Sequence, residues 1–348
     1  MASNKLTVSD FDFDNIKTNL KTFLQGQSEF QDYDFEGSGF AILLDTLAYN
    51  THYLGFNANM LANEMYLDSA DIRKNIVSLA KMLGYTPTSC RASNAVLSVK
   101  VNNVPSTVTS LSMAKGTVFT SSIGGQSYQF VTNQSYTIQP NAGVFQFDNV
   151  NVFEGTLVTF RYTVNSNDVD QKFIIPSGNA DTSTLKVSVQ TSASDTTTEI
   201  YNVANSYSGL NSTTKSYFLQ EGDENRFEVY FGDGILGKKP VDGNIIILEY
   251  VVTNKTEGNG ASAFSLSGDI NGLSDVTITT TSNAANGSEP QTKESIRYNA
   301  PLQYTAQDRA VTSKDYETIV KSVYANAQSV SAWGGEDDET PQYGVVKI

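Results

Sequence analysis

The 348-residue sequence predicts an α+β protein of several domains. Apolar residues follow a helical period from residue 12 to about 84, alternate with polar residues from about residue 94, and return to a helical period after residue 291. These changes predict an N-terminal helical bundle segment, a central antiparallel β domain and an incomplete C-terminal α/β domain. We place the helical region at 1–90, the β-rich domain at 91–253, a loop-rich junction at 254–290 and the start of a truncated α+β domain at 291–348.

Three helices are predicted in the first quarter of the chain. The first carries aspartates near the positive end of its dipole, and Ser38 is predicted to cap the second. The third is expected to open near Asp68 and Ser69 and to stop at Gly84. Large apolar residues line the first two helices: Ile16, Leu20, Phe23, Leu24, Leu43, Leu44 and Leu47.

A short helix hairpin cannot hide this many large apolar groups from water by itself. Full burial of one such side chain contributes about 1.5 to 3 kcal/mol, so the seven residues need a partner surface. The neighbouring β domain could supply that surface within the same chain. We favour a partner in trans and predict that the seven residues are an assembly interface.

The stretch VYFGDGILGKKPVDG contains the pattern G-x-G-x-x-G at Gly232, Gly234 and Gly237. A phosphate-binding loop of this kind must lead into a helix, but Pro240 and the turn dipeptide at Asp242 would stop one within two turns. The run NIIILEYVV that follows reads as a strand. We therefore predict a structural turn in a hairpin, formed by Gly232, Asp233, Gly234 and Gly237, and no bound cofactor.

A second helix signal lies near the C-terminus. Thr312 and Asp315 have the spacing of a capping box, and an apolar helical face follows them. A strand, the acidic run Glu336–Glu339 and another strand come next. Strands need partners and a covering layer, so we expect this domain to be completed by further chain or by another subunit.

The composition argues against most enzymatic chemistry. The net charge of −14 disfavours nucleic acid and anionic membranes as partners, and only 17% of the residues are charged. The single histidine, His52, and the single cysteine, Cys90, lack the spacing of a triad or a zinc site. The acidic run lacks the ligand spacing of a calcium loop, and no carboxylate pair stands out. We therefore expect no catalytic residues and no metal site.

Four separated segments resemble one known family. The segments FGDGILGKKPVDGNIIILEY and GSEPQTKESIRYNAPLQYTAQDRAVTSKDYETIV resemble baseplate J-like proteins of contractile phage tails. The segments EFQDYDFEGSGFAILLDTLAYNTHYL and LGYTPTS are similar, more specifically, to the wedge subunits of T4-like phages. Residues 103–165 show the least resemblance.

The resemblance implies a structural protein of the virion tail, assembled in the host cytoplasm. It implies two copies per wedge, held by neighbouring wedge subunits through a helical bundle, and six wedges in a ring that rearranges when the sheath contracts. It also implies a chain that continues past residue 348, and it carries over no catalytic residue. A receptor-binding tail protein and a tail-associated polysaccharide hydrolase are the alternatives.

Overall fold

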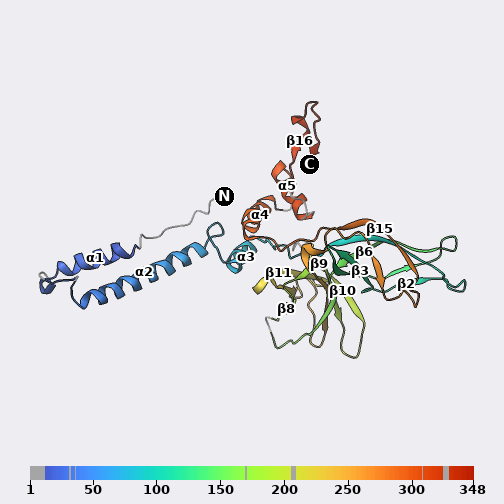
Figure 1. Cartoon of the computed structure of the whole chain (residues 1–348), viewed down its shortest axis with the longest axis horizontal. Helices are drawn as coiled ribbons and strands as arrows, with labels where there is room; N and C mark the ends of the chain where they lie inside the picture. The colour runs from blue at the N-terminus through green and yellow to red at the C-terminus, as the bar shows by residue number, and fades with distance from the viewer. Residues whose placement is uncertain are drawn as a thin grey trace. The chain divides into compact units, whose positions relative to one another are not determined.

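The computed structural model describes residues 12–30, 33–35, 37–168, 171–204, 209–307, 309–323 and 329–348 (Figure 1). The chain divides into two compact units. The helical unit comprises residues 1–85 and 293–304, and the β unit comprises residues 86–292 and 305–348. The predicted α+β class is confirmed.

The helical unit contains the three predicted helices and a fourth from far along the chain: α1 (Phe13–Gln25), α2 (Phe40–Glu64), α3 (Arg73–Met82) and α4 (Lys293–Ala306). The side chain of Asp12 caps α1 by accepting the Asp14 N–H at 2.8 Å. The predicted starts of the second and third helices are wrong. The N-cap of α2 is Gly39 and makes no side-chain bond, so Ser38 does not cap it. Helix α3 starts at Arg73, because the preceding residues form a turn in which Ser69 Oγ donates to the Asn63 carbonyl at 2.7 Å.

Helix α4 completes the core of the helical unit. Its residues Ile296 and Ala300 are fully buried and pack in one cluster with Ile76, Val77 and Ala80 of α3. The sequence prediction assigns residues 293–306 to a C-terminal α+β domain, but most of this helix belongs to the helical unit. Helical periodicity locates a helix without indicating which distant helix covers it, which explains the error.

The first sheet of the β unit has six strands in the order β14-β3-β4-β6-β1-β15. Alternate residues of its strands point into a core that includes Leu97, Phe119, Phe130 and Phe147, all buried. The strands are β1 (Asn94–Val101), β3 (Val118–Ile123), β4 (Gln126–Thr132), β6 (Phe145–Glu154), β14 (Ser265–Ser267) and β15 (Val276–Ala285). A separate short pair joins β2 (Leu111–Met113) to β5 (Tyr136–Ile138).

The sequence predicts a loop-rich junction over 254–290, whereas the structure has β14 and β15 in that segment. Strand β15 runs antiparallel to β1 from Asn94 opposite Ala285 to Val101 opposite Val276. Its threonines and serine alternate with only two large apolar residues. The apolar pattern is therefore weak, which is why sequence reasoning missed the strand.

The second sheet has seven strands in the order β7-β13-β9-β10-β11-β12-β8. Its strands are antiparallel except for one parallel pair, β10 with β11. The strands are β7 (Thr156–Thr163), β8 (Phe173–Ile174), β9 (Ala180–Gln190), β10 (Thr198–Val203), β11 (Ser216–Glu221), β12 (Phe227–Phe231) and β13 (Ile245–Val252). Strands β12 and β13 follow one another in sequence but are not neighbours, so the predicted hairpin is wrong.

Two buried carboxylates lie where the two sheets meet. Glu154, 1% exposed at the end of β6, accepts hydrogen bonds from Thr253 Oγ1 at 2.6 Å and from the backbone and side-chain N–H groups of Asn254 at 2.9 and 2.8 Å. Asp181, also 1% exposed, accepts the Ala92 N–H at 2.9 Å. A buried carboxylate is tolerated when its lone pairs are satisfied in this way. These bonds join the sheets through side chains as well as through the chain itself.

Replacing Glu154 with leucine should destabilise the β unit. The donors of Thr253 and Asn254 would lose their acceptor inside the protein, and each unsatisfied buried group costs about 1 to 3 kcal/mol. We expect a lower midpoint of urea unfolding, followed by circular dichroism at a strand wavelength. Glu224→Leu is the control, because the Glu224 side chain is 78% exposed. Equal midpoints for the two variants would contradict the role given to Glu154.

The C-terminal segment contains α5 (Ser313–Val323), β16 (Trp333–Gly334) and β17 (Val346–Lys347). The predicted capping box is confirmed: Asp315 N–H donates to Thr312 Oγ1 at 3.3 Å, and Thr312 N–H donates to Asp315 Oδ2 at 2.8 Å. Strands β16 and β17 pair with each other. None of the helices in the described ranges has the length and apolar character needed to cross a membrane.

Candidate assembly surface

One face of α2 is covered by α1, which lies antiparallel beside it (Figure 1). Leu44, Ala48 and Gly55 form the buried face of α2. Ile16, Leu20 and Leu24 of α1 are half-buried, and Lys17 pairs with Asp45 of α2 at 2.5 Å. Four aromatic rings cluster at the connection between the helices, mostly edge to face or tilted, with centroids 5.2 to 6.3 Å apart: Phe30, Tyr33, Phe35 and Phe40. Among the described residues, the hairpin is therefore packed along one side of α2 only.

A second face of α2 carries an exposed row of long aliphatic side chains, which we call the leucine stripe. Leu47, Leu54 and Leu61 recur every seven residues, so they lie along one side of the helix. Their exposed fractions are 52%, 60% and 65%. The stripe comprises Leu43, Leu47, Leu54, Leu61 and Met65, and each of them is more than half exposed.

A third face carries mainly aromatic residues, and we call it the aromatic stripe. It comprises Ile42, Tyr49, Tyr53, Phe56 and Met60, all of them exposed. With 3.6 residues per turn, the covered face, the leucine stripe and the aromatic stripe lie roughly a third of a turn apart. A helix that is apolar on all sides is typically buried in a larger assembly.

Helix α2 also carries few charges for its 25 residues. Its two carboxylates are Asp45, paired with Lys17, and Glu64, which is bound by α3. His52 is half-buried on α2. The two stripes therefore present apolar surface without a charge of their own.

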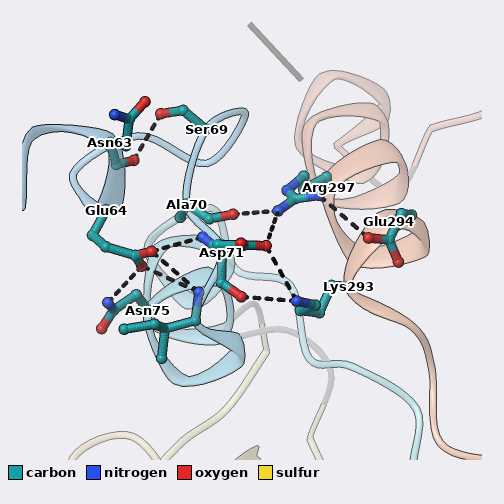
Figure 2. Close-up of polar contacts among 10 residues, drawn as sticks. Asn63, Glu64, Ser69, Ala70, Asp71, Asn75, Lys293, Glu294 and Arg297 are labelled. Carbon is teal, nitrogen blue, oxygen red and sulfur yellow. Dashed lines mark hydrogen bonds and ion pairs between the residues drawn. The ribbon is translucent and has the colours of Figure 1, made fainter. Parts of the chain in front are cut away.

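Glu64 at the end of α2 caps the start of α3, as Figure 2 shows. Its carboxylate accepts the Asp71 N–H at 2.8 Å, the Ile72 N–H at 3.2 Å and Asn75 Nδ2 at 2.7 Å. The apolar side chain of the N-cap residue Ile72 cannot accept these hydrogen bonds itself. Burial raises the pKa of Glu64, but the bonds from Asn75, Asp71 and Ile72 together outweigh burial and lower it.

Two cations of α4 hold the same turn from the other side (Figure 2). Lys293 Nζ donates to the Asp71 carbonyl at 2.9 Å, and the Arg297 guanidinium donates to the Ala70 carbonyl. Arg297 also lies 3.5 Å from Glu294 of its own helix. The end of α2, the turn, α3 and α4 are thus fixed to one another, which gives the free stretch of α2 a rigid base.

Glu64→Gln should make the stability of the helical unit less dependent on pH. Because the folded-state pKa of Glu64 is lowered, its carboxylate contributes stability above the unfolded-state pKa of about 4.3, and that stability is lost as pH falls through the lower folded-state value. Thermal unfolding followed by the helical circular dichroism signal at pH 7, 5 and 3 measures this. The wild type should lose more stability than the variant between pH 5 and 3. Parallel pH curves for the two proteins would contradict the capping role.

The predicted interface residues do not share one environment. Leu44 is 1% exposed on the buried face of α2 and is unavailable to a partner. Phe23, Leu43 and Leu47 are 67%, 57% and 52% exposed. Sequence reasoning missed the residues that continue both stripes towards the C-terminal end of α2, and the seven-residue spacing beyond Leu47 was the signal that could have found them.

The glycine-rich turn is held by hydrogen bonds and leads into strand β13. Asp233 Oδ1 accepts the N–H groups of Ile235 and Leu236 at 2.9 and 3.0 Å. The Leu236 and Ile235 N–H groups hold the pKa of Asp233 below its usual range. Gly234 and Gly237 have φ of +94° and +96°, the left-handed region that glycine favours. No helix N-terminus follows the turn, so the phosphate-binding geometry is not formed there.

Gly237→Ala should destabilise the β unit by about 1 kcal/mol or more, because its φ is positive and because a Cβ would lie 2.9 Å from Ser216 Oγ. Differential scanning calorimetry would show this as a lower Tm. Gly39→Ala is the control, since a Cβ at Gly39 meets nothing within 4 Å. An unchanged Tm for Gly237→Ala would refute the argument from geometry.

The remaining candidates for chemistry lie apart from one another. Cys90 is fully buried, and burial together with Asp181 raises its pKa to about 11, so it stays a thiol at neutral pH. In the acidic run, Asp338 binds Trp333 Nε1 at 2.9 Å and pairs with Lys347. Within the described ranges, His, Cys, Asp and Glu side chains form no group of three that could hold a metal ion.

Known proteins match the two ends of this chain. Residues 12–85 match the protein family described as the helical domain of gp6-like baseplate wedge proteins. The model of the baseplate structural protein gp6 C-terminal domain I matches residues 312–348. Baseplate wedge protein gp6 of Enterobacteria phage T4 is 28% identical over 360 residues, covering 96% of this chain and 53% of the relative. This chain is similar to the gp6-like baseplate wedge proteins.

The residues that match the gp6-like helical domain include α1, α2 and α3, and so both exposed stripes. Helix α4, which completes the core of the helical unit, lies outside that match. The chain spans about half the length of the T4 relative. A chain of the solved baseplate of the anti-feeding prophage is 11% identical to this chain, with a TM-score of 0.36. The match covers 94% of this chain and 67% of the baseplate chain.

Proposed function

We propose that this chain is a structural component of the baseplate wedge of a contractile phage tail, with no catalytic role. Its helical unit would join a helical bundle, and its β unit would contribute to the ring around the central hub. The support is the relation to gp6-like wedge proteins, together with the surface of α2. The glycine-rich turn at 232–237 would be a structural element of the β unit.

The observation that carries this proposal is the apolar surface of α2 on the two faces that α1 leaves open. Ten large side chains are exposed on these faces: Ile42, Leu43, Leu47, Tyr49, Tyr53, Leu54, Phe56, Met60, Leu61 and Met65. Burying each aliphatic one fully would contribute about 1.5 to 3 kcal/mol. Apolar patches of this extent on a soluble protein mark interaction sites.

Two stripes on different faces of one helix fit two further helices. A heptad row of leucines suits a helix packed at a shallow angle, as in bundles and coiled coils. We propose that one stripe binds a second copy of this chain and that the other binds a neighbouring wedge subunit. Sheath contraction would then rearrange the wedge by moving between alternative packings of such interfaces.

Replacing Leu47 and Leu54 with aspartate should abolish co-assembly with neighbouring wedge subunits. Both side chains are exposed, so the free chain should keep its fold, while the partner helix would have to desolvate two carboxylates. Co-expression followed by size-exclusion chromatography measures the complex. The same experiment with Phe23→Asp tests whether α1 contributes.

The control is Ile200→Asp on β10, where an aliphatic residue that is 71% exposed, more than Leu47 or Leu54, lies outside both stripes. This variant should assemble like the wild type. Complex formation by the Leu47→Asp, Leu54→Asp variant at the wild-type level would refute the proposed interface. Circular dichroism of each purified variant separates loss of assembly from loss of fold.

A further inference from the structure

The β unit has a pocket at one end of the second sheet, where the segment 86–91 lies against strands β10 and β11. Its volume of about 190 Å³ is room for about six water molecules. Pro87 of the segment, Val203 of β10 and Leu219 of β11 line it, and most of its surface is apolar.

Hydrogen bonds fix the segment that forms one wall of this pocket. The Thr88 carbonyl accepts the Gln291 N–H at 3.1 Å, and the Thr88 N–H donates to Gln291 Oε1 at 3.2 Å. The backbone of Arg91 pairs with that of Ser288 through bonds of 3.0 and 3.1 Å. The wall is therefore in place before a ligand binds, which lowers the entropic cost of binding.

Two side chains at the pocket have hydrogen-bond donors that the described part of the chain leaves unused. Arg91 is half-buried and is the one charged residue in the lining. Among the described residues, its guanidinium forms no hydrogen bond and no ion pair. Tyr217 is 5% exposed, and its hydroxyl has no partner among the same residues. Burial raises the pKa of Tyr217 to about 12, so this hydroxyl keeps its proton at neutral pH.

The neighbouring serine hydroxyls are already engaged. Ser89 Oγ donates to the Cys90 carbonyl, accepts the Thr182 N–H at 2.9 Å and lies 2.9 Å from Thr182 Oγ1. Ser183 Oγ donates to Asp181 Oδ1 at 2.6 Å. A polar ligand must therefore bind to Arg91 and Tyr217. Because a guanidinium can only donate, the ligand must supply an acceptor.

We propose that this pocket binds a carboxylate carried on a short apolar chain. Arg91 can donate two parallel hydrogen bonds to a carboxylate, and the hydroxyl of Tyr217 adds another. The apolar walls cover the chain that carries the carboxylate. Phosphate fits less well, because a more strongly hydrated anion needs more donors than these two side chains provide. The site is separate from the stripes of α2 and does not rest on the proposed function.

The charge of the protein supports an anion from outside the chain. The chain has 37 acidic and 23 basic residues, yet Arg91 is half-buried without a carboxylate of its own among the described residues. An ion pair at a half-buried position is screened less than one on the surface. A free short-chain acid and a glutamate side chain of another polypeptide both supply this chemistry.

Titration of the full chain, labelled with ¹⁵N-arginine, tests the site by NMR. The chain has six arginines, and the Nε–Hε signal of Arg91 is the one that is missing in Arg91→Gln. Butyrate should shift this signal saturably, at concentrations that leave the signal of Arg161 unchanged. Butyramide, which has nearly the same shape and no charge, should not shift it.

Substitutions test the two donors. By saturation-transfer NMR on butyrate, Arg91→Gln should lower the affinity at least tenfold, and Tyr217→Phe, which keeps the ring, should lower it several-fold. Arg161→Gln on β7 is the matched control, because Arg161 also lacks a side-chain partner among the described residues but is exposed and outside the pocket. It should bind butyrate like the wild type. Circular dichroism of each variant reports whether the fold is kept.

Three results would overturn the proposal: an Arg91 signal that shifts no more than that of Arg161, an equal shift with butyramide or inorganic phosphate, or equal losses of affinity in Arg91→Gln and Arg161→Gln. A titration with N-acetylglutamate α-methylamide distinguishes the two sources. Binding at least as tight as that of butyrate assigns the pocket to a side chain of another polypeptide, and binding of butyrate alone assigns it to a free acid. Both of these results support a carboxylate site.

Discussion

A helix that carries apolar residues on three faces cannot be covered by a single partner helix. Helix α2 illustrates this constraint: Leu44, Ala48 and Gly55 form its buried face, while the leucine stripe and the aromatic stripe on two other faces stay exposed. The rest of the helical unit holds this surface in place. Glu64 ties the end of α2 to α3, and α4 returns from more than 200 residues away to complete the core beneath it.

The β unit differs from the helical unit, because its apolar residues are gathered in buried cores. Its two sheets have closed cores, and they are joined by buried carboxylates whose lone pairs are filled by Thr253, Asn254 and Ala92. Such a joint resists bending, because opening it would leave Glu154 and Asp181 without their donors. A stiff β unit and a helical unit with unsatisfied apolar faces suit a protein that takes its place by assembly.

The side chains that enzymes commonly use for catalysis do not form a cluster among the described residues. Cys90 is sealed inside the β unit with a raised pKa, and His52 lies half-buried on α2. The glycine-rich turn donates its backbone N–H groups to the Asp233 carboxylate and to the carbonyls of Gly237 and Asn211. The two stripes of α2 instead present exposed apolar side chains without a charge of their own. Apolar patches of this extent usually mark interaction sites.

The sequence by itself determined what depends on neighbours along the chain. The period of Ile16, Leu20 and Leu24 located α1, the spacing of Thr312 and Asp315 located the start of α5, and Pro240 ruled out a helix after the glycines. Only the tertiary structure decided which elements meet. It separated β12 from β13 within one sheet, brought Lys293 and Arg297 to the turn at Asp71, and divided the predicted interface into Leu44, which is covered, and Leu47, which is free. Periodicity shows which residues form the apolar face of a helix or strand. The element that covers this face is decided by packing between segments far apart in the chain.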